Sequence, residues 1–192
     1  MPADVYFSVD IEADGPIPGP YSMLSMGMTV CGWFDGERFA PVDLGSFTFY
    51  AELRPISDEF VPAALEVAHL DRERLRREGE EPIDAMTRAA DWVEETAGSG
   101  KPVFVGWPAA FDWMFTHWYF MRFAGRDPFG YASYVDIKSF YVARARLTLE
   151  AASPTHLPKE LRSPRPHTHH ALGDATRQGD VFASLFDWYP DG

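Results

Sequence analysis

The segment DVYFSVDIEADG, residues 4–15, decides the fold of this chain. Residues 4–10 are rich in aromatic and β-branched side chains, which is typical of a β-strand, and the glycines and prolines of residues 14–20 predict a loop after it. Asp10 and Glu12 stand two positions apart at the end of the strand. Because side chains alternate across a strand, we expect both carboxylates on one face of the sheet and their apolar neighbours on the other.

The rest of the chain extends this strand into an α/β fold. Two more strand patterns, at residues 26–34 and 46–53, have short connections that predict an antiparallel meander. The later elements alternate, with strands expected over 102–107 and 134–137 and helices expected over 58–68, 82–97, 112–124, 138–149 and 170–187. This order predicts a single domain over residues 1–192, with a mixed sheet of about five strands flanked by helices.

Composition narrows the class of protein. With 46% hydrophobic and 24% charged residues, the chain is typical of a globular protein, and it has no run of about 18 apolar residues that would span a membrane. The start lacks a secretory signal pattern, and the single Cys31 fits a reducing compartment, so we expect a cytoplasmic protein. The net charge of −12 argues against a broad basic surface for nucleic acid. It still permits a site that binds a few terminal nucleotides through cations.

Three acidic residues suggest a metal site. Asp10 and Glu12 would repel each other unless a cation lay between them, and Mg²⁺ and Mn²⁺ prefer such oxygen ligands. Asp112 lies in the apolar segment GWPAAFDWMF, and carboxylates are seldom buried unless they are paired or bound to metal. Each motif also has a second interpretation. Asp10 and Glu12 could be solvated carboxylates before a loop, and Asp112 could simply begin a helix, where an acidic side chain interacts favourably with the positive end of the helix dipole.

The segment PRPHTHHALGD carries the histidines that could serve catalysis. Asp174 is expected in the second turn of the last helix, with His169 in the proline-rich loop before it. A neutral imidazole is well suited to remove a proton from a water molecule. The alternatives are an exposed histidine-rich loop, or a metal clamp formed by His167, His169 and His170.

Together these motifs resemble the DEDDh branch of the DEDD superfamily of 3′→5′ exonucleases, which includes ribonuclease T, oligoribonuclease and small bacterial stand-alone exoribonucleases. The resemblance extends over FSVDIEADG (7–15), AAFDWMF (109–115), YVDIKSF (134–140) and HHALGDA (169–175). It implies a ribonuclease-H-like fold and hydrolysis that uses two divalent cations, Mg²⁺ or Mn²⁺. It also implies that Asp10, Glu12, Asp112 and Asp174 bind these cations and that His169 is the general base.

The resemblance also implies the substrate, a single-stranded nucleic acid with a free 3′ end, which would be shortened to nucleoside 5′-monophosphates. We expect RNA as the substrate, and DNA is the alternative, because the carboxylates do not sense the 2′-hydroxyl group. Two other classes stay open: a non-catalytic nucleic-acid-binding module on the same fold, and a zinc protein centred on residues 167–170. Homodimers occur among relatives, and the sequence leaves a homodimer open here.

Substrate contacts are expected from two segments. Trp107 and Phe111 are candidates for stacking on a terminal base, although either side chain could instead belong to the core. Lys159, Arg162 and Arg165 precede His169 and are candidate phosphate contacts, with solvated loop charges as the alternative. Asp136, near the end of the last predicted strand, is expected to have a structural or capping role.

Overall fold

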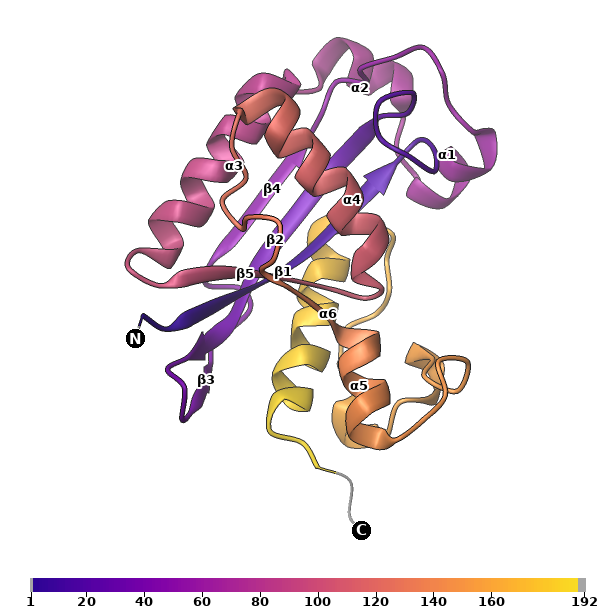
Figure 1. The fold of residues 1–192 in the computed structure, drawn as a ribbon. Coiled ribbons are helices and arrows are strands. Elements are labelled where there is room, and N and C mark those ends of the chain that lie inside the picture. The colour runs from indigo at the N-terminus through magenta and orange to yellow at the C-terminus, as the bar shows by residue number, and fades with distance from the viewer. Residues whose placement is uncertain (1, 190–192) are drawn as a thin grey trace.

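The computed structural model describes residues 2–189, and its centre is a mixed sheet (Figure 1). β1 lies between β2, which is antiparallel to it, and β5, which is parallel to it. β3 and β4 both pair with β2, and β6 pairs with β5 in parallel. The strands are β1 (Asp4–Ala13), β2 (Met23–Phe34), β3 (Phe39–Pro41), β4 (Thr48–Glu52), β5 (Lys101–Gly106) and β6 (Tyr134–Asp136).

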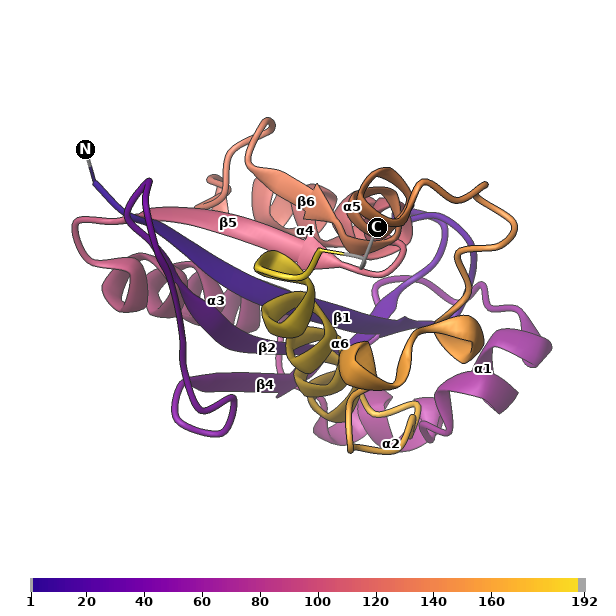
Figure 2. The same ribbon diagram turned by 90° about the horizontal axis from the view of Figure 1, so that it is seen from below.

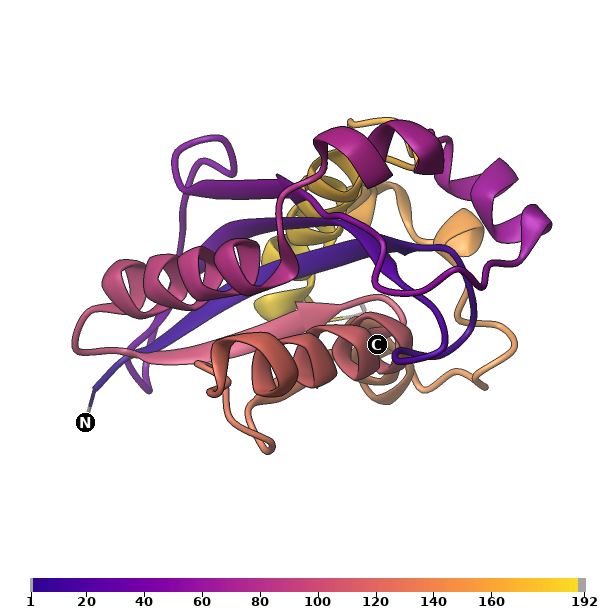
Figure 3. The ribbon, with the colours of Figure 1, turned by 90° about the horizontal axis from the view of Figure 1, so that it is seen from above.

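Helices cover both faces of the sheet. α3 and α4 lie on one face, which is nearer the viewer in Figure 3, and α6 crosses the opposite face in Figure 2. A π-helical turn at residues 120–124 prolongs α4. The helices are α1 (Pro62–Ala68), α2 (Arg72–Glu78), α3 (Pro82–Ala97), α4 (Ala109–Tyr119), α5 (Ile137–Ala145) and α6 (Ala171–Phe186). The predicted α/β fold with a mixed sheet is confirmed.

Alternation along β1 sends its side chains to two different hydrophobic clusters. Phe7 and Val9 are buried in the cluster that α3 and α4 share with the sheet. Tyr6 belongs to the other cluster, where its ring centroid lies 5.0 Å from that of Phe182 in α6. The same alternation carries Asp10 and Glu12 to the face that α6 covers.

A glycine in β2 allows the start of α6 to approach the sheet closely. Gly27 pairs with Asp10 in the β1–β2 register. A Cβ atom at position 27 would lie only 2.2 Å from the backbone nitrogen of Leu172 in the first turn of α6. Glycine at this position therefore lets the helix that carries Asp174 lie directly over the end of β1.

The differences from the predicted elements are small and local. The chain forms an additional short strand, β3, which continues along the same edge of β2 as β4. An additional helix, α2, lies between the helices expected over 58–68 and 82–97. The proline-rich segment before His169 includes two short 3-10 turns, at Pro154–His156 and Lys159–Leu161. Within residues 2–189, no helix is both long and apolar enough to cross a membrane.

Candidate active site

Four carboxylates from three elements meet at the carboxyl end of β1. Asp10 and Glu12 on β1 and Asp174 in α6 each offer an oxygen atom, and these oxygens lie within 4.8 Å of one another. Asp112, in the first turn of α4, accepts a hydrogen bond of 3.1 Å from the backbone N–H of Ile11. That bond attaches Asp112 to the strand between the other two acids. The fold thus brings together acidic residues that are far apart in the sequence.

Burial makes this group of negative charges unfavourable without a counter-charge. Burial raises the pKa of Asp112 to about 7, and burial together with nearby Asp174 raises the pKa of Glu12 to about 7. The pKa of Asp10 is raised well above its ordinary value, first by burial and then by the charges of Asp112 and Glu12. Such a group needs either protons or cations. An all-oxygen ligand set of this kind fits Mg²⁺ or Mn²⁺.

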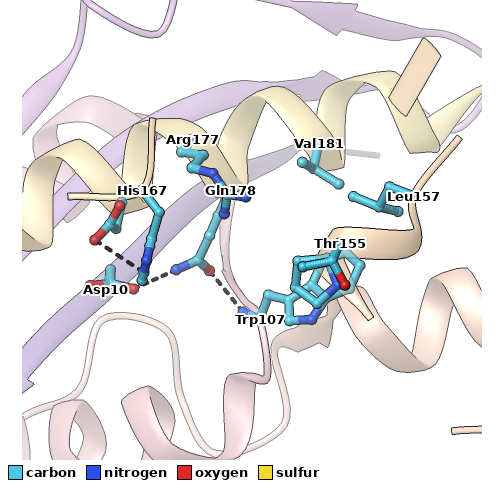
Figure 4. A pocket seen from close by; sticks show the side chains of 10 residues that line it. Asp10, Trp107, Thr155, Leu157, His167, Arg177, Gln178 and Val181 are labelled. Atoms are coloured by element: carbon cyan, nitrogen blue, oxygen red, sulfur yellow. Dashed lines mark hydrogen bonds and ion pairs between the residues drawn. The ribbon is translucent and has the colours of Figure 1, made fainter. Parts of the chain in front are cut away.

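Gln178, in α6, links Asp10 to the turn that follows β5 (Figure 4). Its side-chain amide donates a hydrogen bond to Asp10 Oδ1, and its Oε1 accepts one of 2.7 Å from the backbone N–H of Trp107. Gln178 was not among the site residues predicted from the sequence. The available signal was its spacing of four residues after Asp174, which places both side chains on one face of the helix.

The structure brings two of the three clustered histidines to the carboxylates. His167 Nε2 lies 3.5 Å from Asp174 Oδ2, and the His169 ring centroid lies 4.2 Å from that of His167. His169 itself has a left-handed backbone conformation, with φ of 53°. His170 instead caps α6 and stacks on Tyr50, at 4.6 Å between ring centroids. The expected His169–Asp174 proximity is present, and His167 shares it.

Two pockets flank the carboxylates. One, of about 300 Å³, is lined by Asp10, Trp107, His167 and Arg177 among others, and it is the pocket in Figure 4. The other, of about 400 Å³, lies on the Glu12 side and has mostly apolar walls. The residues that line this apolar pocket are Glu12, Ala13, Gly15, Pro16, Val61, Ala64, Val67 and Phe111. Trp107 and Phe111, both predicted substrate contacts, therefore belong to different pockets.

The three basic residues expected to contact phosphate are not brought to the carboxylates. Arg165 Nε is paired with Asp180 Oδ2 at 3.1 Å, and Arg162 Nε donates to a backbone carbonyl oxygen at 2.6 Å. Lys159 is exposed. Among the described residues that line the pocket beside Asp10, the cationic side chain from α6 is Arg177, which the sequence analysis did not select.

Asp136 has the structural role that was expected. Its Oδ1 accepts the backbone N–H of Ser139 at 2.7 Å and caps α5, and its Oδ2 accepts the backbone N–H of Ala109 at 2.7 Å. These bonds connect the starts of α4 and α5. Asp136 therefore helps to orient the helix that carries Asp112, without joining the carboxylate group.

Comparison with known proteins agrees with this geometry. The chain is 38% identical to the 3′-5′ DNA exonuclease Cap18 of Escherichia coli over 93% of its own length and 90% of the relative's. The nuclease domain of 3′hExo, a DEDDh family member bound to rAMP, has a similar fold, with a TM-score of 0.69, 12% identity, and coverage of 96% of this chain and 91% of that one.

Exonuclease I of E. coli, in complex with a dT13 oligonucleotide, aligns with a TM-score of 0.68 and 18% identity over 96% of this chain and 41% of its own. No protein-family model matches the chain. The likeness to these two structures concerns the fold, whereas Cap18 is similar to this chain in sequence across nearly its whole length. This chain therefore belongs to the family of 3′→5′ exonucleases that includes Cap18, and its fold is that of the DEDDh family member 3′hExo.

Proposed function

We propose that this exonuclease removes nucleotides from the 3′ end of single-stranded DNA and releases nucleoside 5′-monophosphates, using divalent cations held by Asp10, Glu12, Asp112 and Asp174. The observation that carries the proposal is the meeting of these side chains at one end of β1, with oxygens of three of them within 4.8 Å of one another. Among the described residues, the hydrogen-bond donors to these carboxylates include the amide of Gln178 and the backbone N–H groups of Ile11 and Thr168, which are neutral, so a cation would supply the missing positive charge.

The cations would be Mg²⁺ or Mn²⁺, because all four ligands offer oxygen. When bound, such ions stabilise the negative charge of phosphodiester hydrolysis and favour ionisation of the attacking water. The contribution of the chain itself is to keep the ligands in place. Asp112 is fixed by the backbone N–H of Ile11, and Asp174 Oδ1 accepts the backbone N–H of Thr168 at 3.0 Å.

We assign the role of general base to His169. A ring nitrogen of His169 lies within 4.8 Å of ligand atoms of both His167 and Asp174, next to the carboxylates. In its neutral form it would accept the proton of the attacking water. His167 is similarly close to Asp174, so the two histidines must be distinguished by substitution.

The apolar pocket on the Glu12 side is suited to the terminal base. Phe111, which is 39% exposed, presents its ring at this pocket together with Val61 and Val67. Stacking on an exposed aromatic ring contributes about 1–3 kcal/mol per base and does not select a sequence. Across the carboxylates, Arg177 supplies a positive charge for a backbone phosphate, so the scissile bond would lie between the two pockets.

The choice of DNA rests on the relative that is 38% identical, which is named a DNA exonuclease. RNA was expected from the sequence, and that preference stays a prediction, which the assay described below tests. The polar side chains that line the two pockets are those of Asp10, Glu12, Thr155, His167, Asp174, Arg177 and Gln178, and these residue types do not by themselves select ribose or deoxyribose. Relative rates on DNA and RNA will therefore identify the substrate.

The test uses 5′-labelled single-stranded DNA and RNA of the same base sequence, incubated with Mg²⁺, Mn²⁺ or EDTA. We expect a ladder that shortens from the 3′ end, appears faster on DNA, and is absent with EDTA and in the Asp10→Asn variant. Shortening of both oligomers from the 5′ end would contradict the proposed 3′→5′ direction of hydrolysis. Intact oligomers that still bind the protein would instead favour the non-catalytic binding module.

A further inference from the structure

A second group of metal ligands lies next to the four carboxylates and differs from them in chemistry. His167, His169 and Asp174 each present one ligand atom, and the three atoms lie within 4.8 Å of one another. His167 Nε2 and Asp174 Oδ2 are already 3.5 Å apart. Two ligands of one tetrahedral zinc ion, each about 2.0–2.2 Å from the metal, are separated by a similar distance.

The ligand types select a different cation from the one that the carboxylates favour. Two imidazoles and one carboxylate suit Zn²⁺ and similar transition metals, whereas Mg²⁺ and Mn²⁺ prefer oxygen ligands. Three protein ligands with a fourth position open to water are also a common zinc arrangement. The exposed side of His167, with 53% of its side chain accessible, leaves a route from solvent.

We propose that His167, His169 and Asp174 form a second metal site, selective for Zn²⁺, and that zinc bound there inhibits the exonuclease. Asp174 belongs both to this group and to the group with Asp10 and Glu12. Zinc bound to His169 would occupy the lone pair that must accept a proton from water. The inhibitory effect rests on the function proposed above, whereas the binding of zinc does not.

The surroundings already direct Asp174 toward His167. Asp174 Oδ1 accepts the backbone N–H of Thr168, which leaves Oδ2 directed to His167. Bonds of this kind to the second oxygen of a ligand strengthen metal sites. His170 does not take part, since its Nδ1 accepts the backbone N–H of Gly173 at 3.3 Å. It is therefore a matched control, a neighbouring histidine outside the proposed site.

Binding is tested on the full chain in saturating Mg²⁺, by calorimetric titration with Zn²⁺ and by the visible spectrum of Co²⁺. We expect one Zn²⁺ per chain and a tetrahedral Co²⁺ spectrum for wild type and for His170→Asn. In His167→Asn, zinc affinity should fall at least about tenfold and the spectrum should be lost. Equal zinc affinity in His167→Asn and wild type would overturn the proposed site.

Inhibition is tested by adding Zn²⁺ to the Mg²⁺-supported reaction and dividing each rate by the zinc-free rate of the same variant. Wild type and His170→Asn should be inhibited over the range in which zinc binds, and His167→Asn should need at least about ten times more zinc. Zinc that binds through His167 yet leaves the rate unchanged would overturn the inhibitory role. If no variant degrades nucleic acid at all, the proposed function fails, while His167-dependent binding still establishes the zinc site.

Discussion

The carboxylate side and the histidine side of the active site are held in place in different ways. Asp10, Asp112 and Asp174 project from a strand and two helices, and Asp174 exposes only 4% of its side chain. The histidines lie within the segment 162–170, which contains neither helix nor strand, and His167 exposes 53% of its side chain. The difference indicates that the fold determines the carboxylate positions, whereas local contacts determine which histidine reaches them.

The largest effect should follow from a change on the carboxylate side. In Asp112→Asn the amide keeps the size of the side chain and removes one anionic metal ligand. Because a bound metal supplies several kcal/mol of transition-state stabilisation, we expect a loss of roughly 10³-fold in rate. The rate is measured in saturating Mn²⁺, and circular dichroism confirms that the variant is folded.

The control for this prediction is Asp136→Asn, which changes an acid that caps α5 and lies outside the carboxylate group. It should lose far less activity than Asp112→Asn. Similar losses in the two variants would mean that Asp112 acts only through the position of its helix, and the comparison between the two sides would no longer hold.

The second effect distinguishes the histidines. A general base contributes about 10²–10⁴-fold to a rate, so His169→Asn should lose activity in that range. His167→Asn should lose less, because in our assignment its ring does not accept the proton. Single-turnover rates on labelled DNA measure both variants. A larger loss in His167→Asn would transfer the role of base to His167, whose Nε2 is 3.5 Å from Asp174.

Gln178 connects Asp10 to the turn that follows β5, and its replacement should give an intermediate effect. Its hydrogen bond lowers the pKa of Asp10 and thus favours the charged form that binds metal. In Gln178→Met we expect the Mg²⁺ concentration for half-maximal activity to rise, and more so at lower pH. Loss of a partner for a buried group should also cost about 1–3 kcal/mol of unfolding free energy. An unchanged Mg²⁺ requirement would show that Gln178 does not position Asp10.

The smallest effect concerns stability without metal. Glu12 and Asp112 have pKa values of about 7 in the fold, above their ordinary values, so the folded chain binds more protons than the unfolded chain below that pH. Their contribution to stability is therefore lost as pH rises, and in EDTA the melting temperature should fall by several degrees between roughly pH 5 and roughly pH 8.

Added Mn²⁺ should restore much of this stability at the higher pH, because a ligand that binds only the folded state stabilises it. Asp112→Asn, which has one ionisable group fewer, should show a smaller fall with pH. A melting temperature that rises with pH in EDTA would contradict the raised pKa values and, with them, the need for a cation.

The fold and the carboxylate side could be predicted from the sequence because each depends on a local pattern. The alternation in residues 4–10 indicated β1 and the face that carries Asp10 and Glu12. The apolar run before Asp112 indicated a strand that leads into a helix. Strand β3, with three residues, is too short to give a comparable pattern.

The histidine side and the substrate contacts were less accessible to prediction, because they depend on the path of an irregular segment. Arg165 forms an ion pair with Asp180, and Arg162 donates a hydrogen bond to a backbone carbonyl oxygen. No spacing in the sequence indicates either contact. Arg177 and Gln178 follow Asp174 at helical spacing, so their position near the site could have been inferred from that helix. The proximity of His167 to Asp174 required the structure itself.

The measurement that tests the central claim most directly is a crystal structure of the chain with Mn²⁺, in which anomalous scattering locates the ions. We predict Mn²⁺ bound by Asp10, Glu12, Asp112 and Asp174, at the end of β1. The Asp112→Asn variant should show weaker peaks at the same place. Anomalous peaks confined to the histidines, with nothing at the carboxylates, would contradict the account.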